Sequence, residues 1–152
     1  MTKREIFGDI TKISQGIIMH QVNCQNVMGA GVAKSLYQIY PRVKKLYHQL
    51  VEEYNTPAKR FGLLQAVEIS DKLIILNSFS QFAYGNSKRT GKVYTDENVL
   101  MENLKRCDLL AKEKNLPAYV PNQIGCGLAG GNWQHIRQFI LDETDIIIVI
   151  KE

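Results

Sequence analysis

Three apolar runs rich in isoleucine and valine constrain the fold of this chain most strongly. They span residues 16–22, 72–76 and 145–150. A half-exposed strand alternates apolar and polar residues, whereas these runs are apolar over most of their length, which is typical of parallel strands buried on both faces. Each run is also far shorter than the roughly 20 residues that a bilayer requires. The runs therefore predict the central strands of a buried sheet and no membrane span.

Helices are predicted between these strands. Apolar residues recur at three- and four-residue spacing over 43–54, after Pro41, and again over 99–111, where Thr95 is expected to be the N-cap. Asn132 is expected to cap a last helix. Weaker strand patterns cover 4–7, 63–69 and 118–121, and a polar, turn-rich stretch over 82–93 predicts a surface loop. The alternation indicates the α/β class, as a three-layer α/β/α sandwich with a central mixed, mostly parallel sheet.

Length and composition limit the other possibilities. The 152 residues fit one domain over 1–152, with 45% hydrophobic and 22% charged residues, as in ordinary globular proteins. The net charge of +4 favours an anionic ligand without requiring nucleic acid. The 3 cysteines form no CxxC pair, which argues against a disulfide framework and a zinc site. No secretory signal is legible, so we expect a cytoplasmic protein.

Two glycine-rich segments, 28–34 and 124–133, each follow a predicted strand and precede a predicted helix. Glycine lets backbone N–H groups approach a ligand closely, and a helix N-terminus favours negative charge. Both loops would emerge at the carboxyl ends of the strands, where ligands bind in open α/β sheets. The pair predicts a diphosphate cradle, although each loop alone also fits a tight strand-to-helix turn. Neither segment has the spacing of a Walker P-loop or of a Rossmann fingerprint.

Four segments in this order, 8–11, 20–24, 28–33 and 123–133, resemble the macrodomain family, and the resemblance extends from about residue 5 to residue 150. It implies a macrodomain-like fold and a pocket for ADP-ribose, in which Asp9 hydrogen-bonds the adenine amino group with Ile10 beside it. The loop residues implied to grip the diphosphate and distal ribose are Gly29, Ala30, Gly31, Val32, Ile124, Gly125, Cys126, Gly127 and Leu128. The implied ligand is ADP-ribose or a 1''-substituted derivative, with no metal, organic cofactor or membrane partner.

Within the family, the chain is similar to the compact branch that contains the yeast-type ADP-ribose-1''-phosphate phosphatase and the terminal ADP-ribose protein glycohydrolase. The glycohydrolase type uses a lysine at the end of the strand after the central apolar run and an aspartate in the second glycine loop. Here that strand end, 76–81, contains no lysine, and Ala129 occupies the place of the aspartate. An amine nucleophile has no substitute there, which disfavours that mechanism.

The phosphatase type carries a histidine at the position of His20, so His20 and Asn23 are the predicted catalytic residues. A histidine with a pKa of about 6.5 can hold a phosphate or transfer a proton at neutral pH. His20 also fits a core histidine, and Asn23 also fits an Asx turn. The leading prediction is hydrolysis of ADP-ribose-1''-phosphate to ADP-ribose and phosphate. The alternatives are a non-catalytic ADP-ribose-binding module, or a hydrolase that removes ADP-ribose from protein or nucleic-acid adducts.

Overall fold

The computed structural model describes residues 4–152, and residues 1–3 of the expected domain lie outside this part. One six-stranded sheet has the strand order β1-β6-β5-β2-β4-β3. The strands are β1 Glu5–Phe7, β2 Gly16–Asn23, β3 Leu64–Glu68, β4 Leu73–Gln81, β5 Ala118–Pro121 and β6 Ile147–Ile150. Neighbours pair in parallel except β3, which is antiparallel to β4. The predicted mixed, mostly parallel sheet is confirmed.

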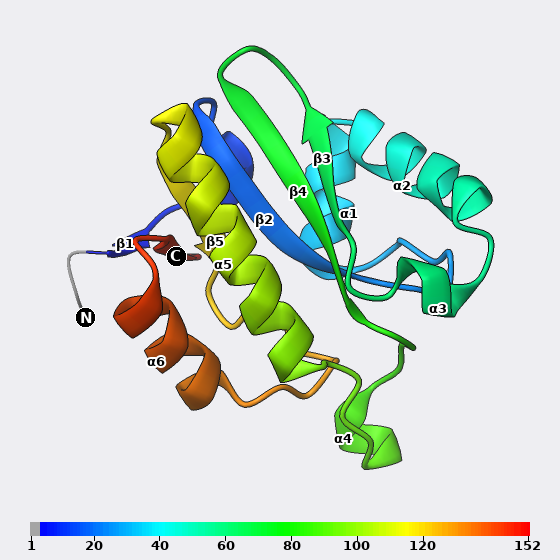
Figure 1. The fold of residues 1–152 in the computed structure, drawn as a ribbon. Helices are drawn as coiled ribbons and strands as arrows, with labels where there is room; N and C mark the ends of the chain where they lie inside the picture. The colour runs from blue at the N-terminus through cyan, green and yellow to red at the C-terminus, as the bar shows by residue number, and fades with distance from the viewer. Residues whose placement is uncertain (1–3) are drawn as a thin grey trace.

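Helices cover both faces of this sheet (Figure 1). The two on one face are α5 (Glu97–Lys114) and α6 (Trp133–Glu143), and those on the other are α1 (Gly31–Ile39) and α2 (Arg42–Glu53). Three shorter elements are the 3-10 helix η1 (Ile10–Lys12), α3 (Pro57–Arg60) and α4 (Ser87–Thr90). The predicted three-layer sandwich is confirmed. Among the residues described, no helix combines the length and the apolar character that a membrane crossing requires.

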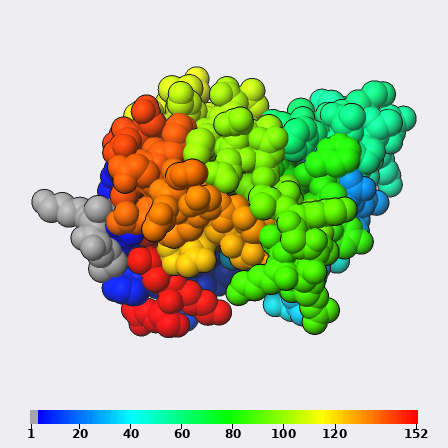
Figure 2. Space-filling view, turned by 90° about the horizontal axis from the view of Figure 1, so that it is seen from below, coloured from blue at the N-terminus to red at the C-terminus, as the bar shows by residue number. Residues whose placement is uncertain are grey.

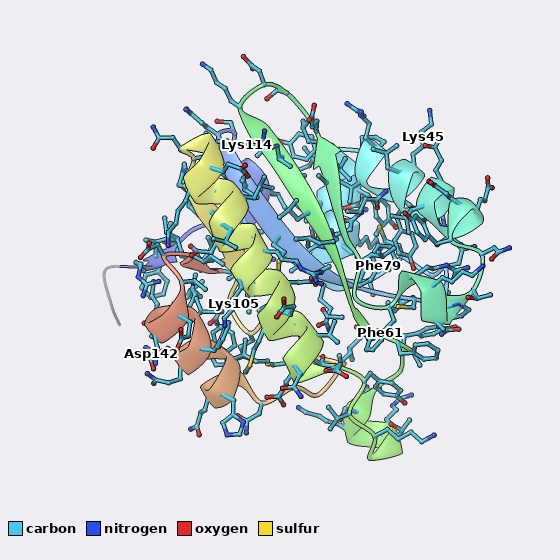
Figure 3. The ribbon with its side chains drawn as sticks, viewed as in Figure 1. Lys45, Phe61, Phe79, Lys105, Lys114 and Asp142 are labelled. Carbon is cyan, nitrogen blue, oxygen red and sulfur yellow. The ribbon has the colours of Figure 1, made fainter. Side chains whose placement is uncertain are left out.

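The alternation along β2 explains why its sequence is apolar over most of its length. Ile17 and Met19 pack against α5 and α6, while Ile18 and Val22 pack against α1 and α2. On the second face, the rings of Phe79 and Tyr47 stack with centroids 5.5 Å apart. Labelled polar side chains point away from the sheet in Figure 3, namely Lys45, Lys105, Lys114 and Asp142, and all four are exposed. Both faces of the central strands are therefore buried.

Three local predictions differ from the structure. The N-cap of α5 is Asp96, not Thr95, because the Asp96 carboxylate accepts a hydrogen bond from Val99 N at 3.0 Å. Strand β4 continues five residues beyond the predicted run, to Gln81, because its polar side chains find buried partners: Asn103 Nδ2 donates to Ser78 Oγ at 2.9 Å. The predicted surface loop contains the short helix α4. The Asn132 cap of α6 is confirmed by a hydrogen bond from His135 N.

Candidate functional site

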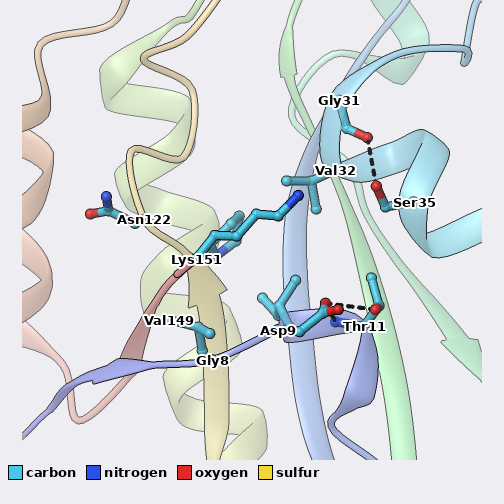
Figure 4. A pocket seen from close by; sticks show the side chains of 11 residues that line it. Gly8, Asp9, Thr11, Gly31, Val32, Ser35, Asn122, Val149 and Lys151 are labelled. Atoms are coloured by element: carbon cyan, nitrogen blue, oxygen red, sulfur yellow. Dashed lines mark hydrogen bonds between the residues drawn. The ribbon is translucent and has the colours of Figure 1, made fainter.

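Two adjoining cavities lie at the carboxyl ends of the parallel strands. The smaller, about 420 Å³, is lined by residues that include Asp9, Thr11, Ser35, Val149 and Lys151 (Figure 4). The larger, about 650 Å³, contains both glycine loops. The cavities share four lining residues, Gly31, Val32, Pro121 and Asn122. They therefore form one cleft, and each has the size of a small-molecule pocket.

The first glycine loop places the N-terminus of α1 against this cleft. Gly31, the first residue of α1, has a φ of +61°, a left-handed conformation that favours glycine. The preceding Ala30 offers no side-chain cap, so the N–H groups of Gly31, Val32 and Ala33 have no partner within the helix. These three residues line the larger cavity. The positive end of the α1 dipole thus faces the junction of the two cavities.

Asn23 shapes the first loop from the end of β2. Its Oδ1 accepts a hydrogen bond from Gln25 N at 2.9 Å, and its Nδ2 donates to Val27 O at 2.8 Å. The Tyr47 hydroxyl donates to Asn23 O at 2.9 Å. Asn23 therefore forms the Asx turn given above as the alternative to a catalytic role, and it also lines the larger cavity.

The second glycine loop lies opposite the first. Figure 2 shows it, yellow to orange, between the red C-terminal residues and the bright green 82–94 segment. The loop closes on itself through a hydrogen bond from Gly131 N to Gly125 O at 2.9 Å. In the part of the chain that the structure describes, no residue accepts a hydrogen bond from the N–H groups of Gly127, Leu128 and Ala129, all of which line the larger cavity. The second loop therefore also offers unpaired donors to the cleft.

A chain of polar side chains, of which Ser80 and Thr95 are buried and Gln21 is half-buried, fastens this loop to the sheet. Ser80 Oγ donates to Gln21 Oε1 at 2.8 Å, Gln21 Nε2 donates to Thr95 Oγ1 at 2.8 Å, and Thr95 Oγ1 donates to Gly125 O at 2.5 Å. This role of the three side chains was not predicted from the sequence. Gln21 alone carried a signal, as a polar residue in a strand predicted to be buried, whereas Ser80 and Thr95 lie outside the predicted strands.

Replacement of Thr95 with valine is expected to lower the free energy of unfolding by about 1–3 kcal/mol, because the hydrogen bonds of Thr95 Oγ1 with Gln21 Nε2 and with Gly125 O are both lost, at about 0.5–1.5 kcal/mol each. Chemical denaturation of the variant measures this loss. The matched control is Thr90→Val on α4, which also removes two hydrogen bonds, from Tyr94 Oη and Lys92 N, but at an exposed position where water replaces them, so it should change the free energy by less than about 0.5 kcal/mol. Equal stability of the Thr95→Val variant and the unaltered protein would contradict the proposed fastening.

Asp9 supplies the anionic group of the smaller cavity. Its Oδ1 accepts hydrogen bonds from Thr11 Oγ1 at 2.6 Å and from Thr11 N at 2.9 Å, and these bonds hold the pKa of the exposed carboxyl below its ordinary value. Ile10, 8% exposed, lies next to it. Lys151, whose place in the site was not predicted from the sequence, lines the same cavity. No sequence motif contains Lys151, because the fold alone brings the residue after β6 beside Asp9.

His20 is buried, with 1% of its surface exposed, although it borders the floor of the larger cavity. Asn77 Nδ2 donates to Gln65 Oε1, so Asn77 Oδ1 is left to accept from His20 Nε2, at 2.5 Å. Burial lowers the pKa of His20 to about 4. The expected titration near pH 6.5 is therefore wrong, because a buried imidazole loses the hydration that stabilises its charge.

The larger cavity has few titratable side chains. Among its lining residues, all of which the structure describes, are no aspartate, glutamate, lysine or arginine. Cys126, predicted to contact the ligand, is not among them; its Sγ donates to Ile124 O at 3.3 Å, and burial raises its pKa to about 12. The remaining predicted loop residues, from Gly29 to Val32 and from Ile124 to Leu128, do line it. The cavity therefore offers hydrogen-bond donors and amides rather than charges.

The sequence matches no family model and no curated protein. Solved structures do match. A Bacteroides thetaiotaomicron protein of unknown function is 26% identical over 97% of this chain and 96% of its own, with a TM-score of 0.81. A macrodomain protein from Streptomyces coelicolor is 20% identical over 97% of both chains, with a TM-score of 0.76. Thermosipho africanus DarTG, solved in complex with ADP-ribose, is 17% identical over 99% of this chain and 42% of its own, with a TM-score of 0.70. The chain therefore has the macrodomain fold.

Proposed function

We propose that this protein, as a single macrodomain, binds ADP-ribose in the cleft at the carboxyl ends of the strands. The observation that carries the proposal is a pair of N–H clusters, at 31–33 and 127–129, whose residues line one cavity and for which residues 4–152 supply no acceptor. Backbone donors at a helix N-terminus and in a glycine-rich loop are suited to a diphosphate. The complex of Thermosipho DarTG with ADP-ribose supports this choice of ligand.

The two cavities suggest how the ligand lies. The adenine amino group donates to Asp9, with the base beside Ile10, and the diphosphate crosses the junction at Gly31 and Val32. The distal ribose then occupies the larger cavity, near Asn23 and the exposed Tyr84. In this orientation the Asp9 carboxylate accepts from the adenine amino group, and the backbone N–H groups at the start of α1 donate to the phosphates.

Hydrolysis of ADP-ribose-1''-phosphate remains the second candidate. The unpaired N–H groups of 127–129 favour it, because backbone donors stabilise the charge of a departing phosphate. Water would be the nucleophile. The neutral, buried His20 cannot hold the phosphate as an imidazolium at pH 7, and no charged side chain lines the larger cavity. Binding is for this reason the principal proposal and hydrolysis the secondary one.

One incubation panel separates the chemical alternatives. The protein is mixed with ADP-ribose-1''-phosphate, ADP-ribosylated protein and ADP-ribosylated DNA, and free ADP-ribose is measured. Release from the first substrate alone supports the phosphatase, and release from either adduct supports a de-ADP-ribosylating hydrolase. Binding of ADP-ribose without release from any substrate supports the non-catalytic module.

Asp9→Ala is expected to weaken ADP-ribose binding about tenfold, because a charge-assisted hydrogen bond to the adenine amino group is lost. The sharper measurement uses the hypoxanthine analogue, which carries a carbonyl in place of the amino group. The unaltered protein should prefer ADP-ribose to this analogue, and Asp9→Ala should bind the two equally. If the variant retains the full preference for adenine, Asp9 does not contact the base.

A further inference from the structure

Lys151 is the one cation among the residues that line the two cavities. Asp9 is the one anion, and every other lining residue is uncharged or, for His20, neutral at pH 7. Within residues 4–152, Lys151 forms neither an ion pair nor a hydrogen bond. An ammonium group that lacks an ion-pair partner and lies over a concave site attracts an anionic ligand.

Lys151 places its positive charge at the smaller cavity, near the start of α1 (Figure 4). The residue directly follows β6, at the same sheet edge as the glycine loops. In Figure 4 its side chain extends across the smaller cavity, and its ammonium end points toward the start of α1, at Gly31 and Val32. Its charge also contributes to the lowered pKa of Asp9. The Lys151 side chain thus lines the same cavity as the Asp9 carboxylate and Gly31, the first residue of α1.

Other nearby lysines do not share this placement. Lys12, in η1, also acts on Asp9 through its charge, but it lines neither cavity. Lys34, on α1, is exposed and lines neither cavity. Lys12 therefore provides a matched cation that differs from Lys151 in its contact with the cleft.

We propose that Lys151 binds the adenosine-side phosphate of the ligand from the β6 side, opposite the N–H groups of α1, and so makes the cleft selective for anionic adenosine nucleotides over neutral adenosine. The inference rests on the proposed function, because the diphosphate of ADP-ribose is the group that the ammonium meets. It adds a side-chain contact to a cradle otherwise made of backbone donors.

The test compares three ligands with four proteins. ADP-ribose and ADP contain the diphosphate and adenosine lacks it, and the proteins are the unaltered chain, Lys151→Met, Lys151→Arg and Lys12→Met. ADP-ribose and ADP are titrated by calorimetry, and adenosine by NMR, which measures millimolar affinities. Lys151→Met should bind ADP-ribose and ADP about tenfold more weakly and adenosine unchanged, since it lacks only the charged contact. Lys151→Arg should retain most of the affinity, and Lys12→Met should lie within about twofold of the unaltered protein.

Three outcomes would overturn the inference: unchanged ADP-ribose affinity of Lys151→Met, an equal loss for adenosine, or an equal loss in Lys12→Met. The difference between the unaltered chain and Lys151→Met should also shrink as salt is raised, because ions screen an exposed contact. Absence of ADP-ribose binding by the unaltered protein is a distinct result, which would overturn the proposed function and the inference together. Lys151 is exposed, so its replacement should leave the fold intact, and circular dichroism checks this.

Discussion

Gly31→Val is expected to weaken ADP-ribose binding by about a hundredfold, the largest effect on binding that we predict. Gly31 lines both cavities, and a Cβ atom built on it meets no protein atom within 4 Å. A valine side chain there would therefore extend into space that the diphosphate is proposed to occupy. The left-handed φ of +61° adds about 1–2 kcal/mol of conformational strain for a residue other than glycine.

Gly62→Val is the matched control for this variant. Gly62 also has a left-handed φ, +91°, and also has no atom within 4 Å of a built Cβ, but it lines neither cavity. Both variants should lose similar stability in chemical denaturation, and only Gly31→Val should lose affinity in calorimetry. If Gly31→Val binds within about twofold of Gly62→Val, the first loop is a turn and not part of the ligand site.

Acidification is expected to destabilise the protein through His20, by about 3 kcal/mol between pH 6.5 and pH 4. The folded-state pKa of about 4 lies below the ordinary value of 6.5, so in this range the unfolded chain binds a proton that the folded chain does not. The contribution of His20 is therefore complete above pH 6.5 and is lost as the pH falls toward 4. Denaturant unfolding measured at a series of pH values gives the slope.

His20→Gln provides the comparison, because glutamine does not titrate and its amide can still donate to Asn77. Its stability should depend less steeply on pH than that of the unaltered protein over the same range. The imidazole resonances of His20 in NMR spectra should also stay constant between about pH 8 and pH 5. An imidazole that titrates near pH 6.5, or equal slopes for the two proteins, would contradict the burial of an uncharged histidine.

The parts of the fold that depend on burial were predictable from the sequence. Continuous apolar runs such as 145–150 identify strands covered on both faces, and the spacing over 43–54 identifies an amphipathic helix, because both patterns follow from local geometry. Polar residues within a buried strand were harder to predict. Asn77 continues β4 only because its partners His20 and Gln65, distant in sequence, satisfy its hydrogen bonds. Such pairing depends on the tertiary structure and has no local signature.

In the candidate site, too, some features were predictable from the sequence and others were not. The glycine loops were predictable because glycine reports a backbone requirement at its own position, as Gly31 does. The protonation state of His20 was not predictable, because its pKa depends on burial by residues far away in the chain. Lys151 and the Thr95 network were missed for the same reason, since the sheet order alone brings them to the cleft.

Calorimetric titration of ADP-ribose into the unaltered protein, with AMP as the comparison, tests the central claim most directly. Saturable binding of one ADP-ribose per chain is expected, with a dissociation constant of roughly micromolar magnitude. AMP should bind more weakly, because it lacks the second phosphate and the distal ribose that the larger cavity is proposed to hold. Failure of ADP-ribose to saturate the protein at about millimolar concentration would contradict the proposed function, and equal affinity for AMP would contradict the assignment of the larger cavity.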